Sequence, residues 1–214
     1  MPATSSRRFA VLVPVKPTAF AKSRLLDLGD RARRDLASAF AADTVAAALA
    51  CHSVARVLVV TDDHELATGL AGLGVDVIPD GTTDDLNGTL RLAAAEMHRR
   101  EPGLALVALC ADLPALRPDE LARALDSSAL SGMSFVADAA GVGTTAVVAG
   151  NLDAFTPAFG PASRQRHVDA GAHEVDAVDV PSLRRDVDDR TDLVEATRLG
   201  LGRRTSLVVT VLGL

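Results

Sequence analysis

The 214-residue sequence contains no tryptophan, no tyrosine and only six phenylalanines. Without aromatic rings the chain lacks a platform on which nucleic-acid bases stack, and its net charge of −6 argues against a general polyanion-binding surface. No apolar run has the length of a membrane span or of a signal peptide. We therefore expect a cytoplasmic protein that binds neither nucleic acid nor a membrane.

Cysteine is also scarce, because Cys51 and Cys110 are the only two in the chain. Two cysteines make no metal-ligand framework, so we expect both as reduced thiols. Hydrophobic residues make up 48% of the sequence and are mostly alanine, valine and leucine, which predicts an aliphatic core. The length suits a single domain over residues 1–214, with a flexible start at 1–8 and an apolar tail of unassigned role at 203–214.

Glycine-rich phosphate motifs are missing after the first apolar run, Phe9 to Val15. A dinucleotide-binding protein needs Gly-x-Gly-x-x-Gly at this place, and a P-loop protein needs its Gly-Lys-Ser/Thr element. Neither motif is present, which disfavours a nicotinamide-dependent oxidoreductase.

Apolar runs alternate with amphipathic segments through the first half of the chain. Short continuous apolar runs are typical of buried parallel strands, and spacings of three and four residues indicate helices. The runs predict strands at 9–15, 54–60, 75–78 and 104–109, with helices at 30–50, 63–73 and 84–100. This rhythm predicts a mostly parallel, three-layer α/β/α sandwich.

The second half is less regular. The runs at 133–137 and 144–149 are separated by a loop too short for a crossover helix, so they pair antiparallel or splay around a site. We expect a helix introduced by Pro118 and another near 159–170. Further strands are expected at 173–180 and 183–187, a helix at 192–199, and an apolar tail at 206–214 that adds an edge strand or covers a partner.

Two acidic segments carry the chemistry. Asp112 follows one apolar run directly, and Asp186 and Asp188 follow another. Open α/β sheets bind ligands at the carboxyl ends of their strands, carboxylates there bind Mg²⁺, and Mg²⁺ binds nucleotide phosphates. Residues two apart in an extended segment project to the same side. The alternative is that these aspartates only cap helices, which is the role we expect for Asp189 and Asp192.

A basic cluster supplies the opposite charge. Lys16, Lys22 and Arg24 follow the first apolar run, so we predict that they bind the nucleotide phosphates and act in catalysis. The alternative is an ordinary solvated surface. Asn87, at the start of an expected helix, either recognises the purine or ribose or only forms a turn.

A candidate anion site lies later in the chain. Gly160, Pro161 and Ser163 predict a helix start with amides and a hydroxyl pointing outward, and the glycine loop before Thr144 offers further donors. The alternative is a capped surface helix. For His167, a packing role and a ligand contact stay equally open.

These segments together resemble the 2-phospho-L-lactate and phosphoenolpyruvate guanylyltransferases of deazaflavin coenzyme biosynthesis, the family called CofC or FbiD. The resemblance runs from about Val11 to Gly200. It rests on Val13-Pro-Val-Lys16, Ala21-Lys22-Ser-Arg24-Leu, Leu86-Asn87, Asp112-Leu-Pro, Ser134-Phe-Val-Ala-Asp138, Gly141-Val-Gly143-Thr144, Phe159-Gly-Pro-Ala-Ser163 with Arg166-His167, and Asp186-Val-Asp188.

The resemblance implies a nucleotidyltransferase of the GT-A type, with a Rossmann-like sheet and Mg²⁺ as cofactor. It implies that the metal is held by Asp112, Asp186 and Asp188, and the acceptor by Thr144, Gly160 and Ser163. Two departures occur: Ala111 stands where the family commonly has glycine, and Asp189-Arg190 replaces its Thr-Pro.

The expected reaction moves GMP from GTP onto the phosphate of phosphoenolpyruvate or 2-phospho-L-lactate and releases pyrophosphate. The expected partners are thus GTP and a small phosphorylated carboxylic acid, and assembly into a homo-oligomer stays open. Two alternatives remain: a molybdopterin-type nucleotidyltransferase, and a regulator that binds guanine nucleotide without catalysis.

Overall fold

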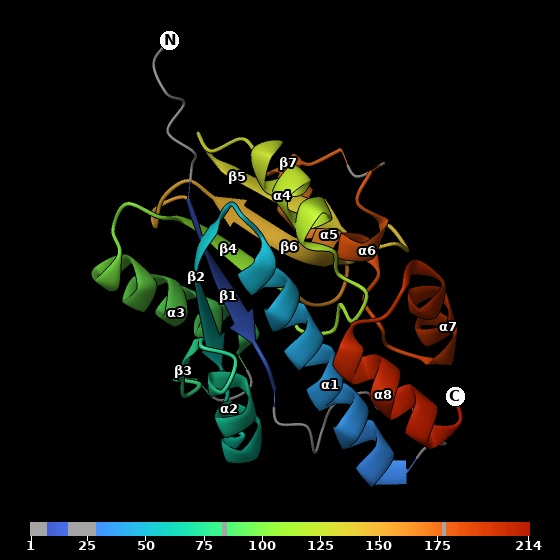
Figure 1. Cartoon of the computed structure of the whole chain (residues 1–214). Coiled ribbons are helices and arrows are strands. Elements are labelled where there is room, and N and C mark those ends of the chain that lie inside the picture. Colours follow the sequence, from blue (N-terminus) through green and yellow to red (C-terminus); the bar gives the residue numbers. More distant parts are fainter. Residues whose placement is uncertain (1–7, 17–28, 83–84, 177–178) are drawn as a thin grey trace.

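The computed structural model describes residues 8–16, 29–82, 85–176 and 179–214. Of the expected flexible start at 1–8, residues 1–7 lie outside the described residues, as do Lys22 and Arg24. Within them, one sheet holds seven strands in the order β3-β2-β1-β4-β6-β5-β7 (Figure 1). The strands are β1 (Phe9–Pro14), β2 (Val54–Val60), β3 (Asp76–Ile78), β4 (Ala105–Leu109), β5 (Met133–Ala137), β6 (Thr144–Ala149) and β7 (His173–Glu174).

Strand direction divides the sheet into two parts. The pairs β3–β2, β2–β1 and β1–β4 are parallel, as the alternating pattern predicts. β6 then runs antiparallel to both β4 and β5, and β7 is parallel to β5. The antiparallel option for the runs at 133–137 and 144–149 is therefore the correct one, and the fold is confirmed as α/β with a mostly parallel sheet.

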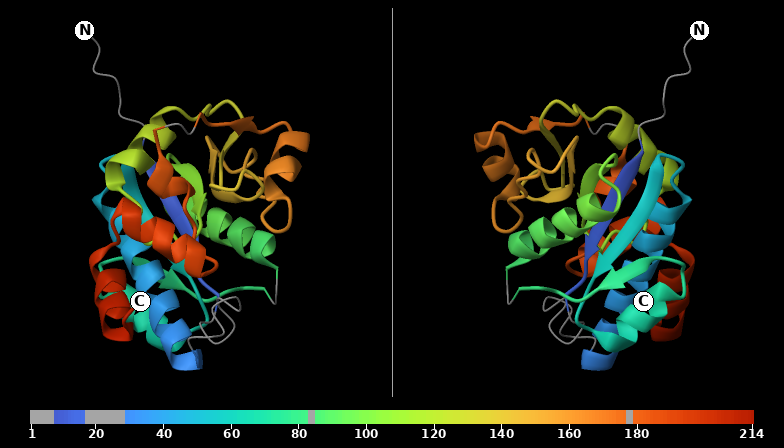
Figure 2. Two further views of the ribbon diagram at one scale, coloured as in Figure 1. Left: turned by 90° about the vertical axis from the view of Figure 1, so that its right-hand side faces the viewer. Right: turned by 90° about the vertical axis from the view of Figure 1, so that its left-hand side faces the viewer.

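Helices cover both faces of this sheet (Figure 2). The side chains alternate across β1, so that Val11 and Val13 pack toward α1, and Ala10 and Leu12 pack toward α3. The helices are α1 (Gly29–Ala50), α2 (His64–Ala71), α3 (Leu86–Arg100), α4 (Pro118–Asp126), α5 (Ser163–Asp169), α6 (Pro181–Arg184), α7 (Arg190–Leu199) and α8 (Arg203–Leu212).

The core is aliphatic, as the composition predicts, and has three parts. The largest lies between the sheet and the helices α1, α2, α4 and α6, and the second lies between the opposite face and α3. The third joins α1 to α7 and α8 around Phe40 and Val187. Both cysteines are free thiols, and no helix in the described ranges has the length and hydropathy needed to cross a membrane.

Two expectations for the second half are wrong, and one of the two options for the apolar tail is excluded. The expected strand at 183–187 is the short helix α6 followed by an extended segment, because Pro181 begins a helical turn and Glu120 accepts hydrogen bonds from the Ser182 amide and hydroxyl, both at 2.7 Å. Of the strand expected over 173–180, the described residues form only the two residues of β7. It has one partner, β5, so little pairing is available to extend it.

The apolar tail is also not an edge strand. It forms α8, whose first amides, those of Arg204 and Thr205, donate to the carboxylate of Asp43 at 3.1 and 2.7 Å. A carboxylate on α1 thus satisfies the otherwise unpaired amides at the start of α8. The apolar pattern suited a strand or a helix equally, and a distant acidic residue favoured the helix.

Candidate active site

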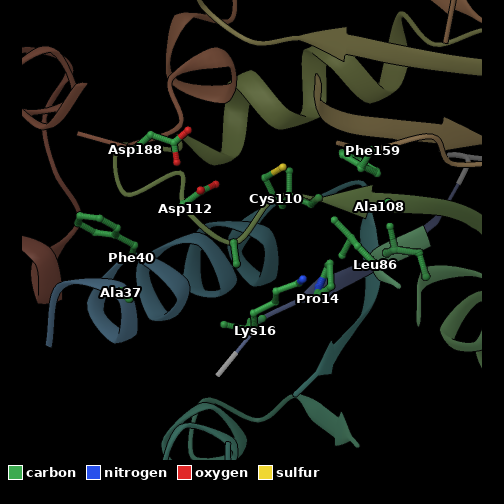
Figure 3. A pocket seen from close by; sticks show the side chains of 14 residues that line it. Pro14, Lys16, Ala37, Phe40, Leu86, Ala108, Cys110, Asp112, Phe159 and Asp188 are labelled. Atoms are coloured by element: carbon green, nitrogen blue, oxygen red, sulfur yellow. The ribbon is translucent and has the colours of Figure 1, made fainter. Parts of the chain in front are cut away.

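A cavity of about 270 Å³ opens at the carboxyl ends of β1 and β4 (Figure 3). Apolar side chains line part of it, among them Phe40, Leu90 and Phe159, and three charged residues also lie in its lining: Lys16, Asp112 and Asp188. The parallel part of the sheet places the ends of β1 and β4 side by side, which is why residues nearly 100 positions apart meet. The cavity therefore joins an apolar surface to charges of both signs.

Asp112 is positioned by a turn that follows β4. Strand β4 ends at Leu109, and Pro114 prevents the strand from continuing because proline has no amide hydrogen to donate. The amide of Val187 donates to the Asp112 carbonyl at 3.0 Å, so a backbone hydrogen bond joins the two acidic segments that lie 74 residues apart. The sequence predicts that the two segments lie close together because each follows a strand, and this hydrogen bond shows that they are in direct contact.

Asp188 is held by the start of α7. Its amide donates to the Asp192 carboxylate at 3.1 Å, and Asp189 and Asp192 form a reciprocal capping box. The capping roles expected for these two residues are confirmed. In Figure 3 the Asp188 side chain points toward Asp112 across the cavity rim. The residue just before the N-cap of α7 therefore places a carboxylate in the cavity lining.

Asp186 is half-buried and does not line the cavity. Across the described stretches of the chain, no three His, Cys, Asp or Glu side chains form a group that could hold a metal ion. Asp112, Asp186 and Asp188 are therefore not a preformed three-carboxylate cage. Mg²⁺ usually takes one or two carboxylates and completes its shell with water and substrate phosphates, and Asp112 with Asp188 fits that donor set.

Lys16 provides the cationic side of the cavity. It follows β1 and is exposed, and its backbone course is set by the hydrogen bond from the Val15 amide to the Val60 carbonyl at 2.8 Å. Figure 3 shows the Lys16 side chain extending along the cavity beside Pro14. Because Lys22 and Arg24 lie outside the described residues, Lys16 is the one member of the predicted basic cluster that the structure describes.

The predicted acceptor residue Thr144 is the first residue of β6 and is buried. Its hydroxyl lies 3.0 Å from Nδ1 of His167, and Nε2 of His167 accepts from the Ala158 amide at 3.0 Å. That amide requires an unprotonated Nε2, so Nδ1 carries the proton and donates to Thr144. Burial lowers the pKa of His167 to about 4, and nearby Arg166 contributes in the same direction.

His167 is a packing residue in this structure. It is fully buried, stacks on Phe135 with ring centroids 5.3 Å apart, and meets the edge of Phe159 at 5.7 Å. The packing alternative that the sequence left open is therefore the observed one. The sequence feature that indicates packing is the spacing of His167, which follows Ser163 by one helical turn and so lies on the same, buried face of α5.

Gly160 and Ser163 lie beside Phe159 but outside the cavity lining. Gly160 has φ +121°, where a side chain would meet the Arg166 guanidinium. Ser163 is only 2% exposed, and its amide donates to the Gly160 carbonyl at 3.1 Å. The Arg164 amide donates to Val142 at 3.1 Å. These two amides do not point outward, contrary to the sequence expectation, because they bond to the adjacent loops.

Asn87 joins the two halves of the site. Its side-chain amide donates to the Phe159 carbonyl at 3.0 Å, and its side-chain oxygen accepts from the Phe159 amide at 2.8 Å. This pair of hydrogen bonds fixes the segment that presents the Phe159 ring to the cavity. Recognition of a purine or ribose by Asn87 stays a prediction, with one amide hydrogen and one lone pair left for it.

Sequence reasoning missed Thr44. It lies inside α1, is fully buried, and contacts the turn that carries Asp112. The available signal is the polar pair Asp43-Thr44 in the middle of an alanine-rich helix, because buried polar residues need hydrogen-bond partners.

Comparison with known protein families identifies the chain over nearly its whole length. A family model described as guanylyl transferase, CofC like, matches residues 9–214. The phosphoenolpyruvate guanylyltransferase of Thermomonospora curvata is 49% identical over 198 residues, which cover 92% of this chain and 87% of that protein. The phosphoenolpyruvate guanylyltransferase of Streptomyces scabiei is 49% identical over 204 residues, 93% of this chain and 94% of that protein.

Solved structures show the same fold at low sequence identity. A nucleotidyl transferase from Methanothermobacter thermautotroptrophicus superposes with a TM-score of 0.59 at 17% identity, over 90% of this chain and 97% of that chain. 4-Diphosphocytidyl-2C-methyl-D-erythritol synthase superposes with a TM-score of 0.57 at 15% identity, over 90% of this chain and 99% of that one. At these identities the likeness shows the fold alone.

Proposed function

Because the chain belongs to the CofC-like family of guanylyl transferases, we propose that it transfers GMP from GTP to the phosphate of phosphoenolpyruvate in deazaflavin coenzyme biosynthesis. The observation that carries the proposal is that Lys16, Asp112 and Asp188 line one cavity together with apolar side chains. Relatives 49% identical to this chain are named for the same acceptor. A cytoplasmic location is part of the proposal.

The reaction requires little proton chemistry. A phosphate oxygen of the acceptor attacks the α-phosphorus of GTP, a new P–O bond forms, and the bond to the bridging oxygen breaks as pyrophosphate leaves with the electron pair. The attacking phosphate is already ionised at neutral pH, so no general base is needed. The protein must instead bring two anions together and neutralise their charge.

Lys16 binds the triphosphate from the β1 side of the cavity and offsets its negative charge. Lys22 and Arg24 are proposed to extend this cationic side. Asp112 and Asp188 would hold Mg²⁺, with Asp186 in support. When bound, Mg²⁺ supplies charge neutralisation and orientation for the phosphates.

The apolar side chains of the cavity lining exclude water from the reacting phosphates. Phe159 forms the wall nearest the predicted acceptor residues, and Asn87 holds that wall in place. We propose that Thr144, Gly160 and Ser163 lie on the acceptor side. In this arrangement the two substrates meet in the cavity, so that the acceptor phosphate reaches the α-phosphorus of GTP.

Incubation with GTP, Mg²⁺ and phosphoenolpyruvate tests the proposal, with mass spectrometry of the product and release of pyrophosphate as readouts. We expect an enolpyruvyl diphospho-guanosine product from the wild type and almost none from Asp112→Asn. Parallel reactions with 2-phospho-L-lactate and 3-phosphoglycerate rank the acceptors. Binding of GTP without pyrophosphate release from any acceptor would favour the regulator, and activity with molybdopterin alone would favour the other transferase.

A further inference from the structure

Thr44 is an unusual residue for its place in the fold. It lies well inside the 22-residue helix α1 and has no exposed surface. A threonine in a helix can satisfy its hydroxyl by bonding the carbonyl four residues earlier. The Thr44 hydroxyl instead leaves its own helix and bonds a segment almost 70 residues away in the sequence.

That segment is the turn carrying Asp112. The Thr44 hydroxyl donates to the Ala111 carbonyl at 3.2 Å and accepts from the Leu113 amide at 3.1 Å. One side chain thus bonds the residue before Asp112 and the residue after it. With the Val187 amide bonded to the Asp112 carbonyl at 3.0 Å, all three consecutive residues of the turn are held by other elements.

The neighbour of Thr44 extends this support to the C-terminal helix. Asp43 accepts hydrogen bonds from the first amides of α8, and the Gly202 amide donates to the Pro114 carbonyl at 2.7 Å. A side chain at Gly202 would collide with the Asp43 carboxylate, so only glycine permits this approach. Two adjacent residues of α1 therefore connect the Asp112 turn and α8 to one helix.

We propose that Thr44 is a positioning residue for guanylyl transfer, which orients the Asp112 carboxylate toward the cavity by bonding the backbone on both sides of it. The expected loss of kcat rests on the proposed function. A small displacement of a group that contacts the reacting phosphates lowers the rate strongly, because catalysis depends on alignment. Loss of the hydroxyl removes the bonds to the Ala111 carbonyl and the Leu113 amide at once, while the bond from the Val187 amide to the Asp112 carbonyl stays.

Thr44→Val tests this, since valine keeps the shape of threonine and removes the hydroxyl. We expect kcat for pyrophosphate release to fall about 10- to 100-fold, and Thr44→Ser to restore most of it. Val45→Ala is the matched control, because Val45 is the next residue, is fully buried, and packs in the main core. It should lower the melting temperature but keep kcat within about 2-fold.

Two further readouts separate positioning from stability. Hydrogen exchange of the Leu113 amide should accelerate in Thr44→Val and stay slow in Val45→Ala. Affinity for Mn²⁺, titrated with GTP present and the acceptor absent, should weaken in Thr44→Val alone. If Thr44→Val does not fold, Thr44→Ala replaces it, since it also lacks the hydroxyl and has a smaller side chain.

Wild-type kcat in a folded Thr44→Val or Thr44→Ala protein would overturn the proposal. An equal loss of kcat in Val45→Ala at equal melting temperature would also overturn it, because stability would then explain the effect. If the wild type itself releases no pyrophosphate with any acceptor, the proposed function fails. In that case Leu113 exchange and Mn²⁺ affinity still decide whether Thr44 holds the turn.

Discussion

The two halves of the site use their polar residues in opposite ways. At the ends of β1 and β4, Lys16, Asp112 and Asp188 direct charged side chains to an open cavity. Under β5 and β6, the polar groups of Thr144 and His167 are buried and bonded to each other or to the backbone. One half has charged side chains in the lining of a cavity, and the other uses its polar groups to hold loops in place.

This difference suggests that the charged residues act on the substrates and that the buried polar residues stabilise the structure around them. Charged groups at a cavity edge cost little while water reaches them, and they gain strength when a ligand excludes that water. Buried neutral groups such as His167 and Thr144 contribute by completing hydrogen bonds that would otherwise be lost. We therefore expect substitutions in the first half to reduce turnover, and those in the second half to change stability or acceptor affinity.

The largest effect is expected for Asp112→Asn and Asp188→Asn, which remove a negative charge without changing volume. Turnover should fall by about 100-fold or more, while the melting temperature changes little. Pyrophosphate release and thermal melting measure the two quantities. Asp186→Asn sharpens the comparison, since Asp186 lies outside the cavity lining, and we expect a smaller loss there. Near wild-type turnover in both Asp112→Asn and Asp188→Asn would contradict the metal assignment.

Lys16→Met should raise the KM for GTP by about 10- to 150-fold, because it removes a hydrogen bond to a charged phosphate worth roughly 1.5–3 kcal/mol. The KM for the acceptor should change less. Arg56→Met is the control, since it removes the same charge from an exposed ion pair with Glu101. A change confined to the acceptor KM would assign Lys16 to the other substrate.

Ser163→Ala should weaken acceptor affinity by about tenfold, the lower end for a hydrogen bond to a charged group, while GTP affinity stays nearly constant. Calorimetric titration of each ligand with Mg²⁺ measures both. Thr145→Val is the matched control, because the Thr145 hydroxyl is buried and has no hydrogen-bond partner among the described residues. Weaker GTP binding with unchanged acceptor binding would reverse the division of the site.

The smallest effect at neutral pH is expected for the stability of His167 variants. Burial lowers the pKa of His167 from its ordinary value of 6.5 to about 4. Between these values the unfolded state binds more protons, so the stabilising contribution is complete above pH 6.5 and is lost as the pH falls toward 4. The loss approaches about 3 kcal/mol at pH 4. Urea unfolding from pH 7 to 4 should show a smaller decline for His167→Gln, and parallel declines would contradict the buried neutral histidine.

Local pattern sufficed for much of the fold. The bounds of β2, β5 and β6 agree with the expected runs, since each is a short β-rich segment bounded by turns. The strand expected at 183–187 was wrong, and so was the edge-strand option for 206–214, because the apolar content of both segments suits a strand or a helix equally. Pro181 with Glu120 decided the first, and Asp43 decided the second.

The sequence by itself determined the α/β class and the family, and it predicted the residue types of the candidate site, because strand periodicity and acidic residues at strand ends are local features. Only the tertiary structure decided which of these residues share a cavity, since that depends on strand order and on hydrogen bonds such as that between Val187 and Asp112. It also decided that Thr44 supports the Asp112 turn. The contact between Thr44 and Ala111 joins residues 67 apart. Such a contact leaves no periodic pattern in the sequence, because the two residues meet only when the chain has folded.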